Sequence, residues 1–174
     1  PGHYILTDRL QLTEDWRVRI SAGATVEFRR GGALKVNGPV HAIGHKDNPV
    51  RIIIDSDPQL GPLGVWGGIL VVNTNRESIL RYTQVYGSGG AVLLYRQDSY
   101  GLTGCVTFYK TSVRIENSSF NALQCEDGLN IISSKFIIDS SKFVDSSADA
   151  FDSDFSDGIV ANSVFRNIMN DGID

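Results

Sequence analysis

The sequence predicts an all-β fold in which short strands stack in parallel as a solenoid, with about 22 residues in each coil. Short runs rich in β-branched and aromatic residues recur along the chain, and clusters of Gly, Asn, Ser and Pro separate them. Acidic tetrapeptides begin at Asp127, Asp149 and Asp171, with a spacing of 22 residues both times. A β-sandwich would give hairpins every 8 to 12 residues or so without a recurring register, so this period favours a solenoid.

A second repeated pattern precedes the acidic tetrapeptides. In three segments, an apolar residue is followed five positions later by phenylalanine, with serine between them. These segments run from Ile115 to Phe120, from Ile138 to Phe143 and from Val160 to Phe165, and residues 80–85 form a weaker copy. We therefore expect two apolar columns to fill the interior. They are Phe120, Phe143 and Phe165, and Val92, Leu129, Phe151 and Ile173.

The first third of the chain supplies the remaining strand signals. Alternating β-forming runs occupy residues 4–6, 18–20, 25–28, 33–36 and 50–54, with turn-forming residues between them. Residues 55–65 and 94–112 break the period, so we expect both segments to protrude as loops. Residues 1–174 are expected to form a single β-helix domain of a longer solenoid or larger protein, because the last repeat lacks a cap.

Composition restricts the partners. The chain is 41% hydrophobic and 21% charged, which is ordinary for a globular domain. No apolar run approaches the roughly 20 residues that span a bilayer, so we expect no membrane insertion. The net charge is −4, and residues 101–174 carry 11 acidic against 5 basic residues. Such an acidic surface repels phosphates, which argues against nucleic acid and leaves cations, or neutral and cationic polymers, as partners.

Two stretches and a set of three repeats carry a family resemblance. They are "ISAGATVEFRRGGALKVNGPVHAIGHKDNPVRIII", "VWGGILV", and the repeats "IENSSF", "IDSSKF" and "VANSVF" with their acidic tetrapeptides. Together they resemble the right-handed parallel β-helix of the pectin-lyase-like superfamily, in particular the β-helix modules of secreted and cell-surface bacterial proteins. The resemblance covers nearly the whole chain. It implies six or seven coils and an extracellular or cell-surface location, and it specifies fold more than activity, since the superfamily includes lyases, hydrolases, epimerases, stalks and adhesins.

The acidic column needs something to offset charge repulsion. Carboxylates stacked about 4.8 Å apart repel by roughly 3 kcal/mol at an effective dielectric constant near 20. Three offsets stay open: hydrogen bonds from turn N–H groups, a bound Ca²⁺, or a proton on one carboxylate. The candidate calcium ligands are Asp127, Asp149, Asp152, Asp154, Asp157 and Asp171.

The resemblance also suggests a catalytic alternative. Lyases of this superfamily abstract a proton with Arg, Lys or His beside a neutralised uronate carboxylate. Arg114, Lys135 and Lys142 are the candidate bases, although each is equally well explained as a solvated charge. The three histidines all lie within residues 3–45, far from the acidic repeats.

Tyrosines near the second irregular segment are candidate sugar-binding residues. Tyr95, Tyr100 and Tyr109 could stack on carbohydrate rings, and buried packing is the alternative for each of them. Cys105 and Cys125 match no zinc or CxxC pattern, so a disulfide, two buried thiols and a functional thiol stay open.

These observations predict a non-catalytic extracellular β-helix module. Its role would be that of a structural stalk or a carbohydrate- or surface-binding domain, with calcium as a candidate stabilising ion. The alternative is a lyase or epimerase that acts on an acidic polysaccharide. The expected partners are a polysaccharide or a cell-surface component, and a second copy of the chain through an uncapped end.

Overall fold

The structure is a computed structural model that describes residues 1–14, 16–29, 32–55, 67–87, 95–97 and 100–174. Of residues 95–97, 100 and 101 it describes the backbone alone. The fold is all-β, and its two large sheets are built from parallel strands. Within the described ranges, no helix has the length and apolar character needed to cross a membrane.

The first sheet contains seven strands, and every neighbouring pair in it is parallel. In spatial order these are β1 (His3–Leu6), β4 (Thr25–Phe28), β7 (Val50–Ile54), β9 (Thr83–Gly87), β13 (Ser119–Asn121), β16 (Lys142–Val144) and β19 (Val164–Arg166). The strands of this sheet therefore lie in the same order as in the chain. Between most neighbouring strands, the chain runs through two strands of the other sheet.

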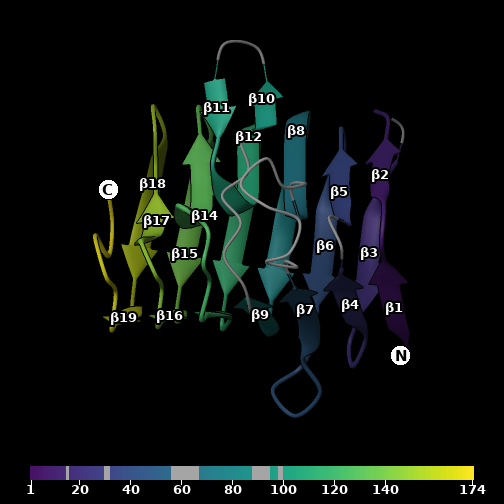
Figure 1. Cartoon of the computed structure of the whole chain (residues 1–174), viewed down its shortest axis with the longest axis horizontal. Coiled ribbons are helices and arrows are strands. Elements are labelled where there is room, and N and C mark those ends of the chain that lie inside the picture. Colours follow the sequence, from purple (N-terminus) through teal and green to yellow (C-terminus); the bar gives the residue numbers. More distant parts are fainter. Residues whose placement is uncertain (15, 30–31, 56–66, 88–94, 98–99) are drawn as a thin grey trace.

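The second sheet has ten strands in two arms that share the long strands β8 (Gly68–Arg81) and β12 (Gly104–Glu116). The first arm adds β2 (Arg9–Leu12), β5 (Ala33–Val36), β14 (Asp127–Ile132) and β17 (Asp149–Asp152). The second arm adds β3 (Val18–Ser21), β6 (Val40–Ile43), β15 (Lys135–Asp139) and β18 (Asp157–Ala161). A separate antiparallel hairpin, β10 (Tyr95–Gln97) and β11 (Tyr100–Leu102), projects from this stack (Figure 1).

The chain visits the first sheet, the first arm and the second arm in turn, and each such circuit is called a pass below. Figure 1 shows the passes side by side along the long axis, with the two termini at opposite ends. His3 pairs with Thr25, 22 residues later, and Ser119, Lys142 and Val164 pair at spacings of 23 and 22. The predicted period is therefore confirmed at both ends of the chain.

The period widens in the middle, where residues 56–66 and 88–103 separate successive strands of the stack. The first predicted loop, 55–65, lies almost wholly outside the described residues. The second predicted loop, 94–112, is too long: Gly104–Glu116 forms β12, which pairs with both β8 and β14. Its alternating Val106 and Phe108 belong to the hydrophobic core, which is why this segment returns to the stack.

Of the bends that recur at the same place in successive passes and use left-handed backbone, two are followed by a Ser or Thr. At one bend, Asn117, Ser140 and Asn162 have φ angles of 49°, 51° and 50°. At the other, Lys110, Ser133 and Phe155 have φ angles of 51°, 49° and 50°. Asn is among the residues that adopt this region most readily, so the Asn-Ser dipeptides of the repeat suit the bend.

The residue after each of these bends is a buried or half-buried Ser or Thr that links neighbouring passes. The Ser118 hydroxyl accepts a hydrogen bond from the Thr83 N–H at 3.1 Å. Ser141 accepts from the Ser118 N–H at 3.3 Å, and Ser163 accepts from the Ser141 N–H at 3.1 Å. The repeated serine is therefore a structural ladder, which satisfies backbone N–H groups where the sheet turns a corner.

The predicted phenylalanine column is confirmed. Phe120 and Phe143 stack with ring centroids 4.8 Å apart, and Phe143 and Phe165 stack at 4.7 Å, with 4° between the ring planes in both pairs. In the second predicted column Leu129 pairs with Phe151 as expected. Ile173 lies beyond the last strand and is half-exposed, and Val92 falls outside the described residues.

A disulfide is the outcome for the two cysteines. Cys105, at the start of β12, is bonded to Cys125 in the bend before β14, and their Cα atoms are 5.6 Å apart. The bond fixes two consecutive passes to each other. Cys105 is buried in the core, so the link lies inside the stack.

Candidate functional site

Parallel pairing of β14 with β17 brings the acidic repeats into register. Asp127 lies beside Asp149, and Asn130 lies beside Asp152 in the next pass. Asp127 and Asp149 therefore share one column, and Asn130 and Asp152 share another. The side chain of Asp127 is buried and that of Asp152 is half-buried.

Asn130 joins the two carboxylates into one cluster. Its Nδ2 donates to Oδ2 of Asp127 at 2.8 Å and to Oδ2 of Asp152 at 3.0 Å. The hydroxyl of Thr103 donates to the same Asp127 oxygen. The Oδ1 atom of Asn130 is buried and has no hydrogen-bond partner among the described residues. We call Thr103, Asp127, Asn130 and Asp152 the acid cluster.

Burial raises the pKa of both carboxyl groups in the acid cluster. The pKa of Asp152 is raised to about 7, first by burial and then by the charges of Asp127 and Asp154. Burial also raises the pKa of Asp127, and the hydrogen bond from Thr103 opposes this shift. The cluster therefore holds a proton near neutral pH, which makes protonation one of the offsets to charge repulsion.

Asp149 is stabilised in a different way. Its Oδ1 accepts hydrogen bonds from Asn170 Nδ2 at 2.7 Å and from the backbone N–H of Asp171 at 2.8 Å. These two hydrogen bonds link Asp149 to the segment that follows the last strand. Hydrogen bonds from a turn therefore act on Asp149 within the acidic column, whereas the carboxyl group with a pKa of about 7, that of Asp152, lies in the neighbouring column.

The candidate calcium ligands are not gathered into a cage. Among the described residues, no group of three or more His, Cys, Asp or Glu side chains is placed to hold a metal ion. Asp154, Asp157 and Asp171 are exposed, whereas Asp127 and Asp149 use carboxylate oxygens in the hydrogen bonds given above. These residues do not fit a calcium cage as arranged, so calcium stays a prediction for solution measurements.

The candidate bases lie apart from the acid cluster, and Arg114 and Lys135 are on paired strands of the second arm. Arg114 on β12 contacts Glu77 at 3.4 Å and Glu116 at 3.8 Å. Lys135 begins β15 in the second arm, where it pairs with Asp157, and Lys142 lies on β16 in the first sheet. The acid cluster belongs to the first arm, so the structure does not combine these bases with those carboxylates.

Tyr109 is buried rather than exposed, which corrects its prediction as a sugar platform. It packs in a second hydrophobic cluster on the outer face of the first arm, with Leu70, Val72, Leu102 and Ile132. Lys110 Nζ lies 4.9 Å from its ring centroid. The side chains of Tyr95 and Tyr100 lie outside the described residues.

Two features were missed by sequence reasoning. A polar furrow follows the bend between the second arm and the first sheet, and Lys46, Gln84, Asn117, Ser119 and Lys142 line it. Lys46 and Lys142 are almost a hundred residues apart in the chain, so only the repeat register could have brought them together. The second feature lies in the first sheet, where Glu27 is buried beside Arg29. Oε2 of Glu27 lies 2.6 Å from His3 Nε2, and the hydrogen bond from Arg29 lowers the pKa of Glu27.

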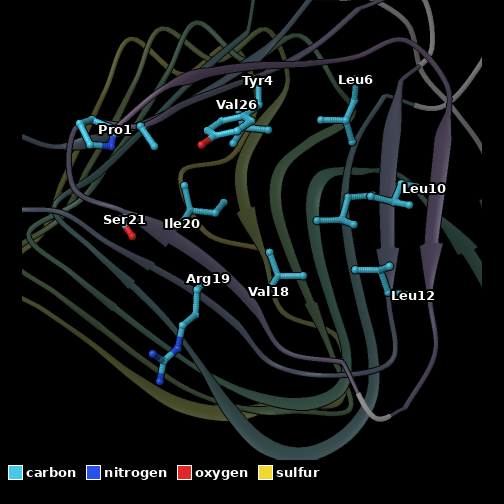
Figure 2. Close-up of a pocket in the computed structure, with 12 residues that line it drawn as sticks. Pro1, Tyr4, Leu6, Leu10, Leu12, Val18, Arg19, Ile20, Ser21 and Val26 are labelled. Carbon is cyan, nitrogen blue, oxygen red and sulfur yellow. The ribbon is translucent and has the colours of Figure 1, made fainter.

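An apolar cavity lies at the end of the stack that carries the N-terminus, distant from the acid cluster. It has a volume of about 350 Å³ (Figure 2). Apolar side chains reach into it from three sides, from β1, β2 and β3.

The chain matches no family model, and neither a curated protein nor a solved structure matches it.

Proposed function

We propose that the chain is a right-handed parallel β-helix module of the pectin-lyase-like type, which acts outside the cell as a rigid, non-catalytic binding surface. Parallel strands related by a crossover are right-handed in nearly all known sheets, which supports the handedness. Three columns of parallel strands, whose register shifts between β8 and β12 at Thr111/Val113, support the β-helix.

The separation of the acid cluster from the candidate bases supports a non-catalytic role. A general base must lie within hydrogen-bond reach of the proton that it removes, beside the group that stabilises the developing charge. Arg114 is paired with Glu77, and Lys142 is on the opposite sheet from the acid cluster. The acid cluster in turn is occupied with its own internal hydrogen bonds.

The disulfide supports the proposed location. Disulfides persist in oxidising compartments, such as the extracellular space, and are rare in the cytosol. The bond between Cys105 and Cys125 ties together two passes in the middle of the stack, as expected of a structural disulfide.

The polar furrow supports an acidic polysaccharide as the ligand. Lys46 and Lys142 supply positive charge, while Gln84, Asn117 and Ser119 supply the amides and hydroxyls that bind sugar hydroxyl groups. Because residues of successive passes line the furrow, it suits an extended polymer of uronate residues, whose charges would meet the two lysines in turn.

Calorimetric titration with an oligogalacturonide tests this proposal. Binding is expected in the unmodified chain, with affinity reduced at least about tenfold in Lys46→Ala/Lys142→Ala, because two charge contacts are lost. Lys135→Ala is the matched control, since it removes one lysine from the second arm and leaves the furrow intact. Absence of binding to the unmodified chain, or equal loss in the control, would contradict the furrow as the binding site.

The alternative is a lyase or epimerase. The acid cluster favours it, because two carboxyl groups in different environments are a common acid and base pair in enzymes. Incubation with acidic polysaccharide and calcium, followed through the absorbance of the unsaturated product, is expected to give no rise. A rise that Asp152→Asn abolishes would establish the enzyme instead. Melting with calcium and with a chelator tests the ion separately, and an unchanged melting temperature would remove calcium.

A further inference from the structure

We infer that Tyr82 is the stacking residue of the polar furrow, on which one sugar ring of the bound polysaccharide lies. This inference rests on the proposed function, since it concerns the same furrow, and it names the side chain that recognises a sugar ring. Lys46 and Lys142 supply positive charge, which attracts any chain of carboxylates. An aromatic ring in the furrow adds a preference for carboxylates that are carried on sugars.

Tyr82 lies in the bend between the second arm and the first sheet, and it lines the furrow. Its equivalents in the next three passes are Asn117, Ser140 and Asn162. The equivalence follows from the backbone, because the N–H groups of Tyr82, Asn117 and Ser140 each donate to the residue before the next bend at 3.1 Å. This column therefore carries a large ring at Tyr82 and small polar side chains in the three later passes.

The bend itself does not require an aromatic residue. Tyr82 has a left-handed φ angle of 46°, and Asn117 and Asn162 make the same bend with φ angles of 49° and 50°. Asn adopts this region readily, whereas a bulky residue is an outlier there. Hydrogen bonds on both sides hold the strained backbone, since Tyr82 N–H donates to the preceding-bend carbonyl of Glu116 and Tyr82 O accepts from Val50 N–H at 3.1 Å. Residues held in strained backbone in this way are typical of ligand-binding sites.

The ring and the hydroxyl group of Tyr82 are both placed to contact a ligand. The side chain is half-buried, so part of it faces the furrow, which has a volume of about 440 Å³. Within the described parts of the chain, the Tyr82 hydroxyl forms no hydrogen bond, whereas the Tyr86 hydroxyl donates to Gln84 Oε1 at 3.0 Å. A half-buried tyrosine with an unused hydroxyl offers an apolar surface for a sugar ring and a polar group for its hydroxyls.

The register places Tyr82 between the two lysines along the stack. Lys46 lies in the same bend one pass earlier. On the other side, Gln84, Ser119 and Lys142 form one row across β9, β13 and β16, so Lys142 lies two strand spacings, about 10 Å, from Gln84. A uronate chain that follows the furrow would therefore place carboxylates beside both lysines and a sugar ring on Tyr82.

Calorimetric titration of Tyr82→Asn with an oligogalacturonide tests the inference. Asn is the residue that the same bend carries at Asn117 and Asn162, so the variant should fold, with a melting temperature at least equal to that of the unmodified chain. Its affinity should fall at least about tenfold, because the stacked ring is lost. Tyr82→Phe keeps the ring and should retain most of the affinity. Far-UV circular dichroism checks the fold of both variants.

Phe155→Asn is the matched control. It makes the aromatic-to-Asn change at the bend between the first and second arms, where φ is 50°, and Phe155 does not line the furrow. Its affinity for the oligogalacturonide should therefore equal that of the unmodified chain. Polyglutamate is the matched probe, because it carries carboxylates without sugar rings. The unmodified chain should prefer the oligogalacturonide, and Tyr82→Asn should reduce this preference.

The outcomes separate this inference from the proposed function. An unmodified chain that does not bind the oligogalacturonide would overturn both. Binding that Lys46→Ala/Lys142→Ala weakens and Tyr82→Asn leaves unchanged would overturn the role of Tyr82 alone. Equal losses in Tyr82→Asn and Phe155→Asn, equal losses in Tyr82→Asn and Tyr82→Phe, or an unchanged preference over polyglutamate would also overturn it, because stacking on this ring would not explain them.

Discussion

The side-chain amide of Asn130 donates a hydrogen bond of 3.0 Å to Asp152 across two neighbouring parallel strands. The same amide nitrogen donates to Asp127 at 2.8 Å, so one donor holds two carboxylates. Two carboxyl groups that share one donor repel each other less when one of them is protonated. Asp152, with a pKa of about 7, is the one that titrates near neutrality.

The raised pKa of Asp152 predicts a pH-dependent stability. The pKa of Asp152 in the folded state lies above its ordinary value of 3.8, so folding favours the protonated carboxyl group. The contribution of this group to the free energy of unfolding is fully present below about pH 4 and is lost as pH rises through about 7. Asp152→Asn carries no charge at any pH, and its amide oxygen can accept the bond from Asn130. We expect it to raise the free energy of unfolding at about pH 8 by about 1 kcal/mol, a value reduced because the side chain is half-exposed.

Urea denaturation of both proteins at acidic and alkaline pH measures this effect. The gain from Asp152→Asn should disappear in acid, where the wild-type carboxyl group is already neutral. Asp157→Asn is the control, since it removes a nearby carboxylate that is exposed. A gain that persists unchanged at both pH values would contradict a titrating Asp152.

The disulfide predicts a loss of stability on reduction. It closes a segment with a sequence separation of 20 residues, for which loop entropy gives about 3 kcal/mol. For a chain of this size such a loss lowers the melting temperature by roughly 10 °C. Scanning calorimetry with and without reductant measures the change, and Cys105→Ala/Cys125→Ala should melt at the lower temperature under both conditions. An unchanged melting temperature after verified reduction would show that the bond is not stabilising.

Much of the stack could be predicted from sequence because its repeated residues have repeated physical tasks. Phe120, Phe143 and Phe165 recur since each fills the same interior position, and their spacing correctly predicts which strands are neighbours. Strands Arg9–Leu12 and Val40–Ile43 were missed. The first, Arg-Leu-Gln-Leu, alternates but is only 4 residues long, and it lacks the β-branched and aromatic residues that mark the predicted strands.

The site was less predictable because hydrogen bonding at a corner depends on side-chain direction, which spacing does not specify. The sequence indicated that Asp127 and Asp149 stack, and the structure places them in register. It could not indicate that Asn130 turns toward Asp152 while Asn170 turns toward Asp149. Burial of Tyr109 depends on the outer cluster with Leu102, which follows a segment without a repeat.

The serine ladder predicts a cost for removing a single hydroxyl. Ser118 accepts from the buried Thr83 N–H at 3.1 Å, so Ser118→Ala leaves that donor without its partner and should cost about 1–3 kcal/mol of unfolding free energy. Ser163→Ala is the matched control in the outermost pass, where the hydroxyl is half-exposed and water can replace it. Equal losses in urea denaturation would contradict a role for burial.

The aromatic stack predicts the largest effect of a single substitution. Phe143 lies between Phe120 and Phe165, with ring centroids 4.8 and 4.7 Å away, and its side chain is fully buried. Phe143→Ala removes both ring contacts and leaves a cavity, so we expect a loss of about 3–5 kcal/mol in the free energy of unfolding. Phe155→Ala makes the same chemical change on a side chain that is 77% exposed, and its loss should stay below about 1 kcal/mol. Urea denaturation of both variants measures the difference, and comparable losses would mean that the stacked column does not dominate the core of these passes.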